Sequence, residues 1–165
     1  MKKTALLLAL VLILSLLSAC GGDSGSTPAE TVKDPGMDAV KSAVSACLEN
    51  DEMMELDTSY IEALIKLSAE DYAECYAMRS SVGTNIDEYG IFRCSGAEQT
   101  AATADALKTY VQFLLDAWMQ EYLPEEFPKL QNAEVWTEGD YVVYAIVSDD
   151  VRGSMKDAFC ASFEP

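Results

Sequence analysis

The clearest chemical pattern in the chain lies at its start, where Leu17-Ser18-Ala19-Cys20 closes a long apolar run. Lys2 and Lys3 precede that run. A basic start, a short apolar segment and small residues before a cleavage point are the pattern of a secretory signal peptide. The run is also shorter than the ~20 residues that a membrane-spanning helix usually needs. The sequence therefore predicts a signal peptide over residues 1–19, with cleavage between Ala19 and Cys20.

The same four residues resemble the bacterial lipobox, in which the cysteine is the lipid attachment point. The resemblance implies that Cys20 carries a diacylglyceryl thioether, and a thiol is required because sulfur is nucleophilic enough to be alkylated under mild conditions. Stable anchoring takes more than one acyl chain. We therefore expect a membrane partner through lipidated Cys20 and a location at the outer face of the cytoplasmic membrane. The alternatives are an uncleaved anchor and an ordinary secretory signal with an incidental cysteine.

The sequence contains no recognisable pattern of catalytic or metal-binding residues. Nucleophilic catalysis by serine or cysteine usually recruits a histidine base, and the chain contains no histidine. With 28 acidic residues, a carboxylate pair suited to a glycosidase arises by chance. The cysteine spacings do not match a zinc site, and the acidic stretch 49–57 lacks the spacing of a calcium loop. We expect no enzyme activity, no metal site and no cofactor.

Three aromatic residues form a candidate ligand site. Tyr141 and Tyr144 lie on one expected strand, where they point to opposite sheet faces, and Trp136 lies on the neighbouring strand. Exposed aromatic side chains there would bind a sugar or a peptide. The competing interpretation is that these rings pack in the core or at a sheet edge.

Charge excludes one class of partner. The chain has 11 basic and 28 acidic residues, a net charge of −17. Removing residues 1–19 takes away two lysines, so nine basic residues remain against 28 acidic ones and the net charge becomes −19. A surface with this charge repels nucleic acid and anionic headgroups. The acids are spread along the chain, which favours a solvated surface over a cation-binding one.

Four further cysteines lie on expected apolar faces: Cys47, Cys75, Cys94 and Cys160. Outside the cell they could form two disulfides, with three alternative connectivities. No regular cysteine framework is present, which favours four small buried thiols.

The chain divides into three parts by composition. Residues 20–35 are rich in Gly, Ser, Thr and Pro and predict a flexible tether. Residues 36–165 have the length of one domain. Helical spacing of apolar residues predicts a first helix over residues 37–50, and capping signals predict short helices over residues 60–67 and 68–78.

The second half of the domain has the clearer patterning. It predicts a strand at residues 86–94 with a bulge or bend at Gly90. A long helix over residues 97–122 has one apolar face, and Pro124 and Pro128 end it in an extended linker. Strands at residues 133–138 and 141–148 flank a Gly139 hairpin turn. Asp149 or Asp150 is expected to cap a last helix. The expected fold is α+β: N-terminal short helices, then β-α-β-β-α, with an antiparallel three-stranded sheet and helices packed on one face.

The C-terminal half, with Gly139-Asp140-Tyr141, Ile146-Val147-Ser148-Asp149 and Ala158-Phe159, resembles an uncharacterised family of small lipoproteins from Gram-positive, clostridia-like bacteria over roughly residues 37–165. The resemblance implies an origin and an envelope location but no activity. We expect a non-enzymatic accessory or interaction module with an envelope protein partner or a small ligand. The alternatives are a small solute- or cell-wall-binding protein that uses an aromatic sheet face, and a carboxylate-based hydrolase.

Overall fold

The computed structural model describes residues 34–48, 52–119 and 121–164. The predicted signal peptide, the cleavage site between Ala19 and Cys20, the lipid attachment at Cys20 and the tether up to residue 33 lie outside these residues. All described residues belong to one compact unit. Within the described ranges, no helix combines the length and the apolar character that a membrane crossing requires.

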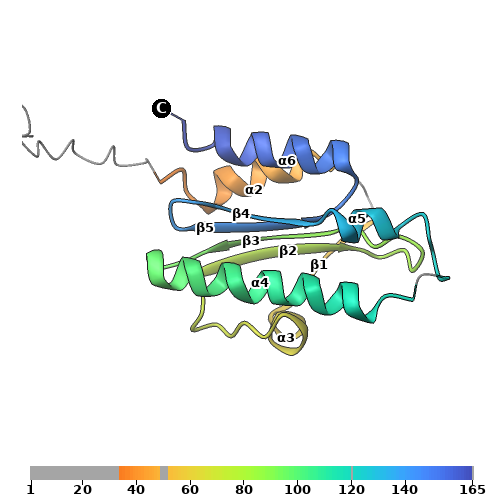
Figure 1. Cartoon of the computed structure of the whole chain (residues 1–165). Coiled ribbons are helices and arrows are strands. Elements are labelled where there is room, and N and C mark those ends of the chain that lie inside the picture. The colour runs from red at the N-terminus through yellow and green to blue at the C-terminus, as the bar shows by residue number, and fades with distance from the viewer. Residues whose placement is uncertain (1–33, 49–51, 120, 165) are drawn as a thin grey trace, which may run out of the picture. The chain divides into compact units, whose positions relative to one another are not determined.

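Five antiparallel strands form one sheet in the spatial order β1-β2-β3-β5-β4 (Figure 1). The α+β class is confirmed, but the expectation of a three-stranded sheet is wrong, because the N-terminal half supplies two further strands that extend the sheet beyond β3. The strands are β1 (Met53–Glu55), β2 (Glu74–Ser80), β3 (Glu88–Arg93), β4 (Glu134–Glu138) and β5 (Tyr141–Ile146).

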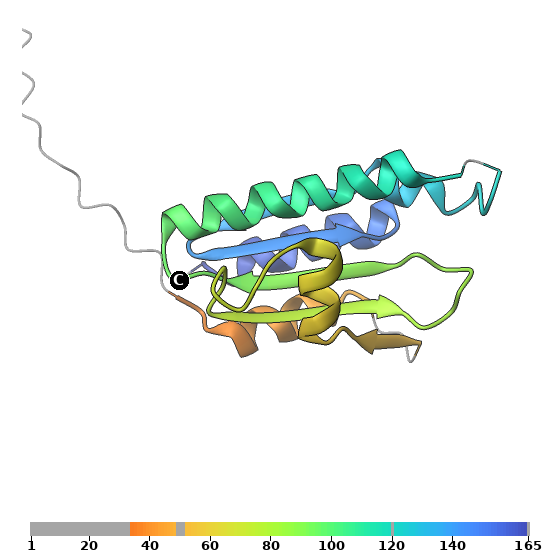
Figure 2. The same cartoon turned by 90° about the horizontal axis from the view of Figure 1, so that it is seen from below.

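Helices cover both faces of the sheet (Figures 1 and 2), which corrects the expectation of helices on one face. One face carries α2 (Met37–Ser45) and α6 (Asp149–Ala161). The other carries α3 (Thr58–Tyr60), the π-helical turn η2 (Ile61–Ile65), α4 (Ala97–Ala117) and α5 (Phe127–Gln131). The C-terminal order is the expected β-α-β-β-α with α5 inserted between α4 and β4.

The central strand β5 explains the two helical layers. Every residue from Tyr141 to Ile146 is buried, and the side chains alternate between two separate cores. Val142, Tyr144 and Ile146 contact the core beneath α4. Their neighbours Tyr141, Val143 and Ala145 contact the core beneath α2 and α6. A strand that is apolar on both sides must be covered on both sides, so this run requires helices above and below.

The prediction of a helix over residues 68–78 is wrong. Its start does form half of a capping box, because the Ser68 N–H donates to Asp71 Oδ2 at 2.7 Å. The chain then becomes extended as β2 and pairs with β3 in continuous register. Backbone pairing in the sheet satisfies the same groups as a helix would, and tertiary contacts decide between the two.

Gly90 does not mark a bulge, one of the two alternatives expected there. It pairs in register with Ala77 on β2 and with Tyr144 on β5. The Tyr144 ring lies directly against Gly90, so that a Cβ at this position would sit 2.5 Å from Tyr144 Cε1. Glycine is therefore required here for close packing.

The long helix starts as predicted but ends earlier, at Ala117. Trp118 has an extended backbone (ψ 130°), and its ring stacks on Phe127 at a centroid distance of 6.0 Å. The expected extended linker instead contains α5, where Pro128 occupies the first helical turn, a position that needs no N–H donor. Tyr122, expected on the apolar face, is 56% exposed.

Two smaller expectations have different outcomes. The tight turn between β4 and β5 is confirmed, with Gly139 at φ 53° in the left-handed region that favours glycine. The N-cap of α6 is Ser148, while Asp149 and Asp150 lie inside its first turn. Their negative charges lie at the positive end of the helix dipole, where they stabilise the helix.

The four described cysteines are free thiols, and their burial differs. Cys94 is buried, Cys47 and Cys75 are half-buried, and Cys160 is exposed. The placement of Cys160 on an apolar face is therefore wrong.

Candidate functional site

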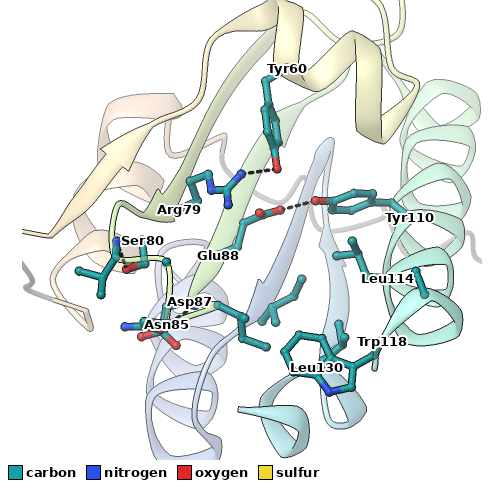
Figure 3. Close-up of a pocket in the computed structure, with 15 residues that line it drawn as sticks. Tyr60, Arg79, Ser80, Asn85, Asp87, Glu88, Tyr110, Leu114, Trp118 and Leu130 are labelled. Atoms are coloured by element: carbon teal, nitrogen blue, oxygen red, sulfur yellow. Dashed lines mark hydrogen bonds between the residues drawn. The ribbon is translucent and has the colours of Figure 1, made fainter. Parts of the chain in front are cut away.

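A cavity of about 300 Å³ opens beside the end of the β2–β3 hairpin (Figure 3). This size is at the lower end of the roughly 300–1,000 Å³ typical of small-molecule sites. One side is apolar and formed mainly by α4, α5 and β5, with Leu114, Ala117, Trp118, Leu130 and Ile146. The other side is polar and comes from α3, the hairpin and the adjoining strands, with Tyr60, Arg79, Ser80, Asn85, Asp87 and Glu88. Tyr110 lies between the two sides in Figure 3.

Glu88 is the buried carboxyl of this pocket. Strand alternation places it on the same face of β3 as Gly90 and Phe92, toward the core beneath α4. Only 6% of Glu88 is exposed. Its Oε1 accepts hydrogen bonds from the hydroxyls of Tyr110 at 2.9 Å and Tyr144 at 2.8 Å. The second oxygen, Oε2, has no hydrogen-bond partner among the described residues.

Burial controls the protonation of this cluster. It raises the pKa of the Glu88 carboxyl above its ordinary value, and the two tyrosine hydroxyls and the charge of Arg79 oppose that shift only in part. Burial and the neighbouring Glu88 also raise the pKa values of Tyr110 and Tyr144. Both phenols therefore keep their protons and act as hydrogen-bond donors.

Arg79 supplies the positive charge of the pocket. It lies directly opposite Glu88 in the register of β2 and β3. Its Nη1 donates to the Tyr60 hydroxyl at 2.7 Å, and its guanidinium carbon lies 5.3 Å from the centre of the Tyr60 ring. Arg79 and Glu88 form no direct ion pair. Each charge is instead held in place by tyrosine side chains.

A buried ionic cluster fixes the hairpin end of the pocket. Lys129 of α5 lies 2.8 Å from Asp87 Oδ1 and 2.9 Å from Glu126 Oε2, and Glu126 also accepts the N–H of Ile86 at 3.0 Å. These three side chains are 11–18% exposed. Burial alone would lower the pKa of Lys129, but the hydrogen bonds and charges of its two partners raise it overall. The cluster joins α5 to the residues before Glu88.

Trp118 adds a buried donor at the apolar side. Its Nε1 is buried and has no hydrogen-bond partner among the described residues. Buried polar atoms are nearly always paired, so this unpaired donor needs an explanation, and a bound ligand or water is one. The ring itself lines the cavity.

The three aromatic residues suggested by the sequence do not form a joint binding surface, which corrects that interpretation. Trp136, Tyr141 and Tyr144 are at most 8% exposed. Trp136 and Tyr141 belong to the core beneath α2 and α6, where they bond to Glu134 and Asp34. Tyr144 belongs to the opposite core and reaches the pocket only through its hydroxyl on Glu88.

Sequence reasoning missed Glu88, Arg79 and Tyr110 as site residues. A signal for Glu88 exists, since strand alternation groups it with Gly90 and Phe92 on a core-facing side, where a carboxyl is unusual. A signal for Tyr110 also exists, because it is three residues from Leu107 on the apolar face of α4. Arg79 had no such signal, because it directly follows residues 68–78, which were interpreted as a helix and not as a strand.

A second hollow, of about 530 Å³, lies between η2 and α4. Its rim includes the exposed side chains of Leu64 and Phe113. Tyr110 lies between the two hollows, since it lines both. The second hollow offers apolar contact without a buried charge among its lining residues. Across the described residues, no group of three or more acidic, cysteine or histidine side chains is arranged to hold a metal ion.

The fold and the pocket define a small α+β domain with a buried carboxyl in a lateral cavity. The chain belongs to the family described as a domain of unknown function, DUF4358, which matches residues 46–147. That segment contains every residue that lines the pocket. No curated protein and no solved structure matches the chain.

Proposed function

We propose that this protein is a lipid-anchored extracytoplasmic protein whose folded domain binds a small ligand in the Glu88 pocket, without catalysis. One observation carries the binding role: Glu88 is buried at the cavity, with Oε1 fixed by two tyrosines and Oε2 unpaired. Burying a carboxyl removes water from it, which costs free energy of folding and raises its pKa. Such a cost is typical of positions that serve a ligand.

The anchor is supported by the N-terminal sequence. The basic start, the apolar run and the lipobox-like Leu17-Ser18-Ala19-Cys20 fit lipid attachment at Cys20. The resemblance to clostridial lipoproteins supports the same location and a Gram-positive origin. We expect metabolic labelling with a fatty-acid analogue to mark the wild-type protein and not a Cys20→Ala variant. A Cys20→Ala protein that still carries label would refute the anchor.

A carboxylate-based hydrolase is the second candidate, because a buried carboxyl with a raised pKa in a cavity is a frequent sign of a general acid. Most glycosidases need a second carboxylate across the scissile bond. The other acid that lines this pocket, Asp87, is held in an ion pair with Lys129 at 2.8 Å. We therefore assign binding to the pocket. Turnover of a sugar substrate by the wild type and not by Glu88→Gln would instead establish the hydrolase.

A thermal-shift screen of the full chain in detergent tests the binding role. The panel contains calcium, sugars, cell-wall fragments, amino acids and peptides. A ligand at about 100 times its Kd adds about 2.7 kcal/mol to the stability of the folded state, which raises the midpoint by several degrees. The shift should be absent in Glu88→Gln and retained in Glu98→Gln, a matched change at an exposed position on α4. A flat response to the whole panel would refute ligand binding and leave an envelope protein partner as the role to test by crosslinking.

A further inference from the structure

We infer that the pocket recognises a free α-amino acid with an apolar side chain, whose ammonium group binds Glu88 and whose carboxylate binds Arg79. This inference rests on the proposed binding function and names its ligand class. The three parts of the argument are the placement of the two charged side chains, the charge of the whole chain and the apolar side of the cavity.

The two charged groups are neighbours that do not satisfy one another. Glu88 and Arg79 are directly opposite residues of an antiparallel strand pair, where Cβ atoms are about 4.5–5.5 Å apart. Opposite charges at this spacing normally pair. Here Tyr60 holds Arg79, while Tyr110 and Tyr144 hold Glu88. The tyrosines therefore keep the two charges apart and leave bonding capacity on each.

The hydrogen-bonding groups that remain free on Arg79 and Glu88 match the carboxylate and the ammonium group of a zwitterion. A guanidinium has five N–H donors in a planar fork that suits a carboxylate, and Arg79 uses Nη1 on Tyr60. Glu88 Oε2 is free of described partners and can accept from an ammonium. In an α-amino acid the two charges are separated by a single carbon, so one small molecule can reach both residues of a cross-strand pair.

Net charge argues against a simple ion. The chain carries −17, which repels a free anion even though Arg79 offers it a partner. A simple cation would pair with Glu88 but leave the Arg79 charge beside it. A zwitterion satisfies both groups and leaves the charge of the protein unchanged.

The side-chain preference follows from the opposite wall. Leu114, Trp118 and Leu130 face the cavity across from the charged pair (Figure 3). With its volume of about 300 Å³, the cavity suits a compact apolar group. Leucine is therefore the first probe.

Isothermal titration calorimetry of the full chain in detergent tests the assignment with L-leucine and two analogues. N-acetyl-L-leucine lacks the ammonium charge, and L-leucinamide lacks the carboxylate. A hydrogen bond to a charged group contributes about 1.5–3 kcal/mol, which corresponds to roughly a 10- to 150-fold change in Kd. We expect each analogue to bind at least about tenfold more weakly than leucine.

Crossed variants assign each end of the ligand to its residue. Arg79→Gln should bind leucine and leucinamide about equally, because the carboxylate partner is gone. Glu88→Gln should bind leucine and N-acetyl-leucine about equally. Arg93→Gln, which removes an exposed arginine of β3 that pairs with Asp34 and Glu74, is the control and should keep the wild-type preferences.

Three results would overturn the inference, and they separate it from the proposed function. If leucine and both analogues bind equally, the pocket does not recognise the two charged groups of the amino acid. If no amino acid binds while a sugar or peptide shifts the thermal midpoint through Glu88, the binding function holds and the ligand class is wrong. If no compound of the panel binds, both proposals fail together.

Discussion

Substitution of Gly90 by alanine tests whether the packing of the central strands holds the pocket together. The new Cβ would lie 2.5 Å from Tyr144 Cε1 and 3.2 Å from both Ala77 Cβ and Phe92 Cε2. Tyr144 is fully buried, and its hydroxyl is fixed on Glu88 at 2.8 Å. We therefore expect the new Cβ to displace the buried ring and to break its bond to Glu88.

The cost has two parts. Overpacking of a close-packed core costs about 1–3 kcal/mol. Moving the Tyr144 ring also breaks a hydrogen bond to a charged group, which contributes about 1.5–3 kcal/mol. Together they predict a loss of roughly 2.5–6 kcal/mol in the free energy of unfolding, a large fraction of the ~5–15 kcal/mol typical of a domain. Ligand affinity should fall as well, because Glu88 loses one of its two fixed donors.

Urea denaturation followed by circular dichroism measures the effect, with Gly153→Ala as the matched control. Gly153 lies within α6, and a Cβ there would meet nothing within 4 Å. Alanine in a helix interior is about 1 kcal/mol more favourable than glycine, so the control should raise stability where Gly90→Ala lowers it. In a Tyr144→Leu background the clashing ring atom is gone, and Gly90→Ala should cost less than in the wild type.

A loss below about 0.5 kcal/mol for Gly90→Ala, the usual range for changes at neutral surface sites, would refute the reasoning. So would an equal cost of Gly90→Ala in the wild-type and Tyr144→Leu backgrounds, because the cost would then not come from that ring.

Three further predictions concern charge. Because burial raises the pKa of Glu88, the wild type should lose free energy of unfolding as pH rises from about 4.5 through the folded-state pKa, by about 1.4 kcal/mol per unit of pKa shift. Glu88→Gln cannot ionise, so its thermal midpoint should exceed that of the wild type at pH 8, and this advantage should disappear toward pH 5. Lys129→Met should lower the free energy of unfolding, measured by urea denaturation, by about 3–5 kcal/mol, since two buried carboxylates lose their partner. The control Lys108→Met removes one member of an exposed ion pair and should change the free energy of unfolding by less than about 1 kcal/mol. Hydrogen bonds from Trp136, Lys156 and Arg152 lower the pKa of Glu134 to about 2, so its contribution to stability should be lost as pH falls from about 4.5 toward 2, and an acid titration of Glu134→Gln should show a shallower loss than the wild type.

Local patterning was enough to predict the elements that one stretch of sequence specifies by itself. The apolar run at residues 141–147 requires a central strand, and Gly139 supplies the positive φ that the hairpin turn needs. The stripe of Met155, Phe159 and Phe163 predicts α6, and the structure buries all three. The same apolar run also implies that helices cover both faces of the sheet, so the second helical layer could have been predicted from the sequence.

Other features depend on contacts that local patterns do not contain. Residues 74–80 carry apolar side chains at spacings that fit a helix or a strand, and only the pairing with β3 decides for β2. Trp118 leaves the helical path at a point where its ring stacks on Phe127 of α5, a contact between segments that the helical pattern does not contain. The pocket cluster draws on α3, β2, β3, α4 and β5, so its members are far apart in sequence until the sheet brings them together. The burial of the aromatic residues of β4 and β5 depends on the same kind of contact, since α2 and α4, which help to cover them, come from distant parts of the chain.

Tryptophan fluorescence gives the most direct test of the claim that a ligand occupies the Glu88 pocket. The chain has two tryptophans: Trp118 lines the pocket, and Trp136 lies in the core on the other side of the sheet. Titration of a compound that shifts the thermal midpoint should change the emission of a Trp136→Phe variant, which retains Trp118, and leave a Trp118→Phe variant unchanged. An emission change that follows Trp136, or no change in either variant while the compound still binds, would contradict the assignment of the site.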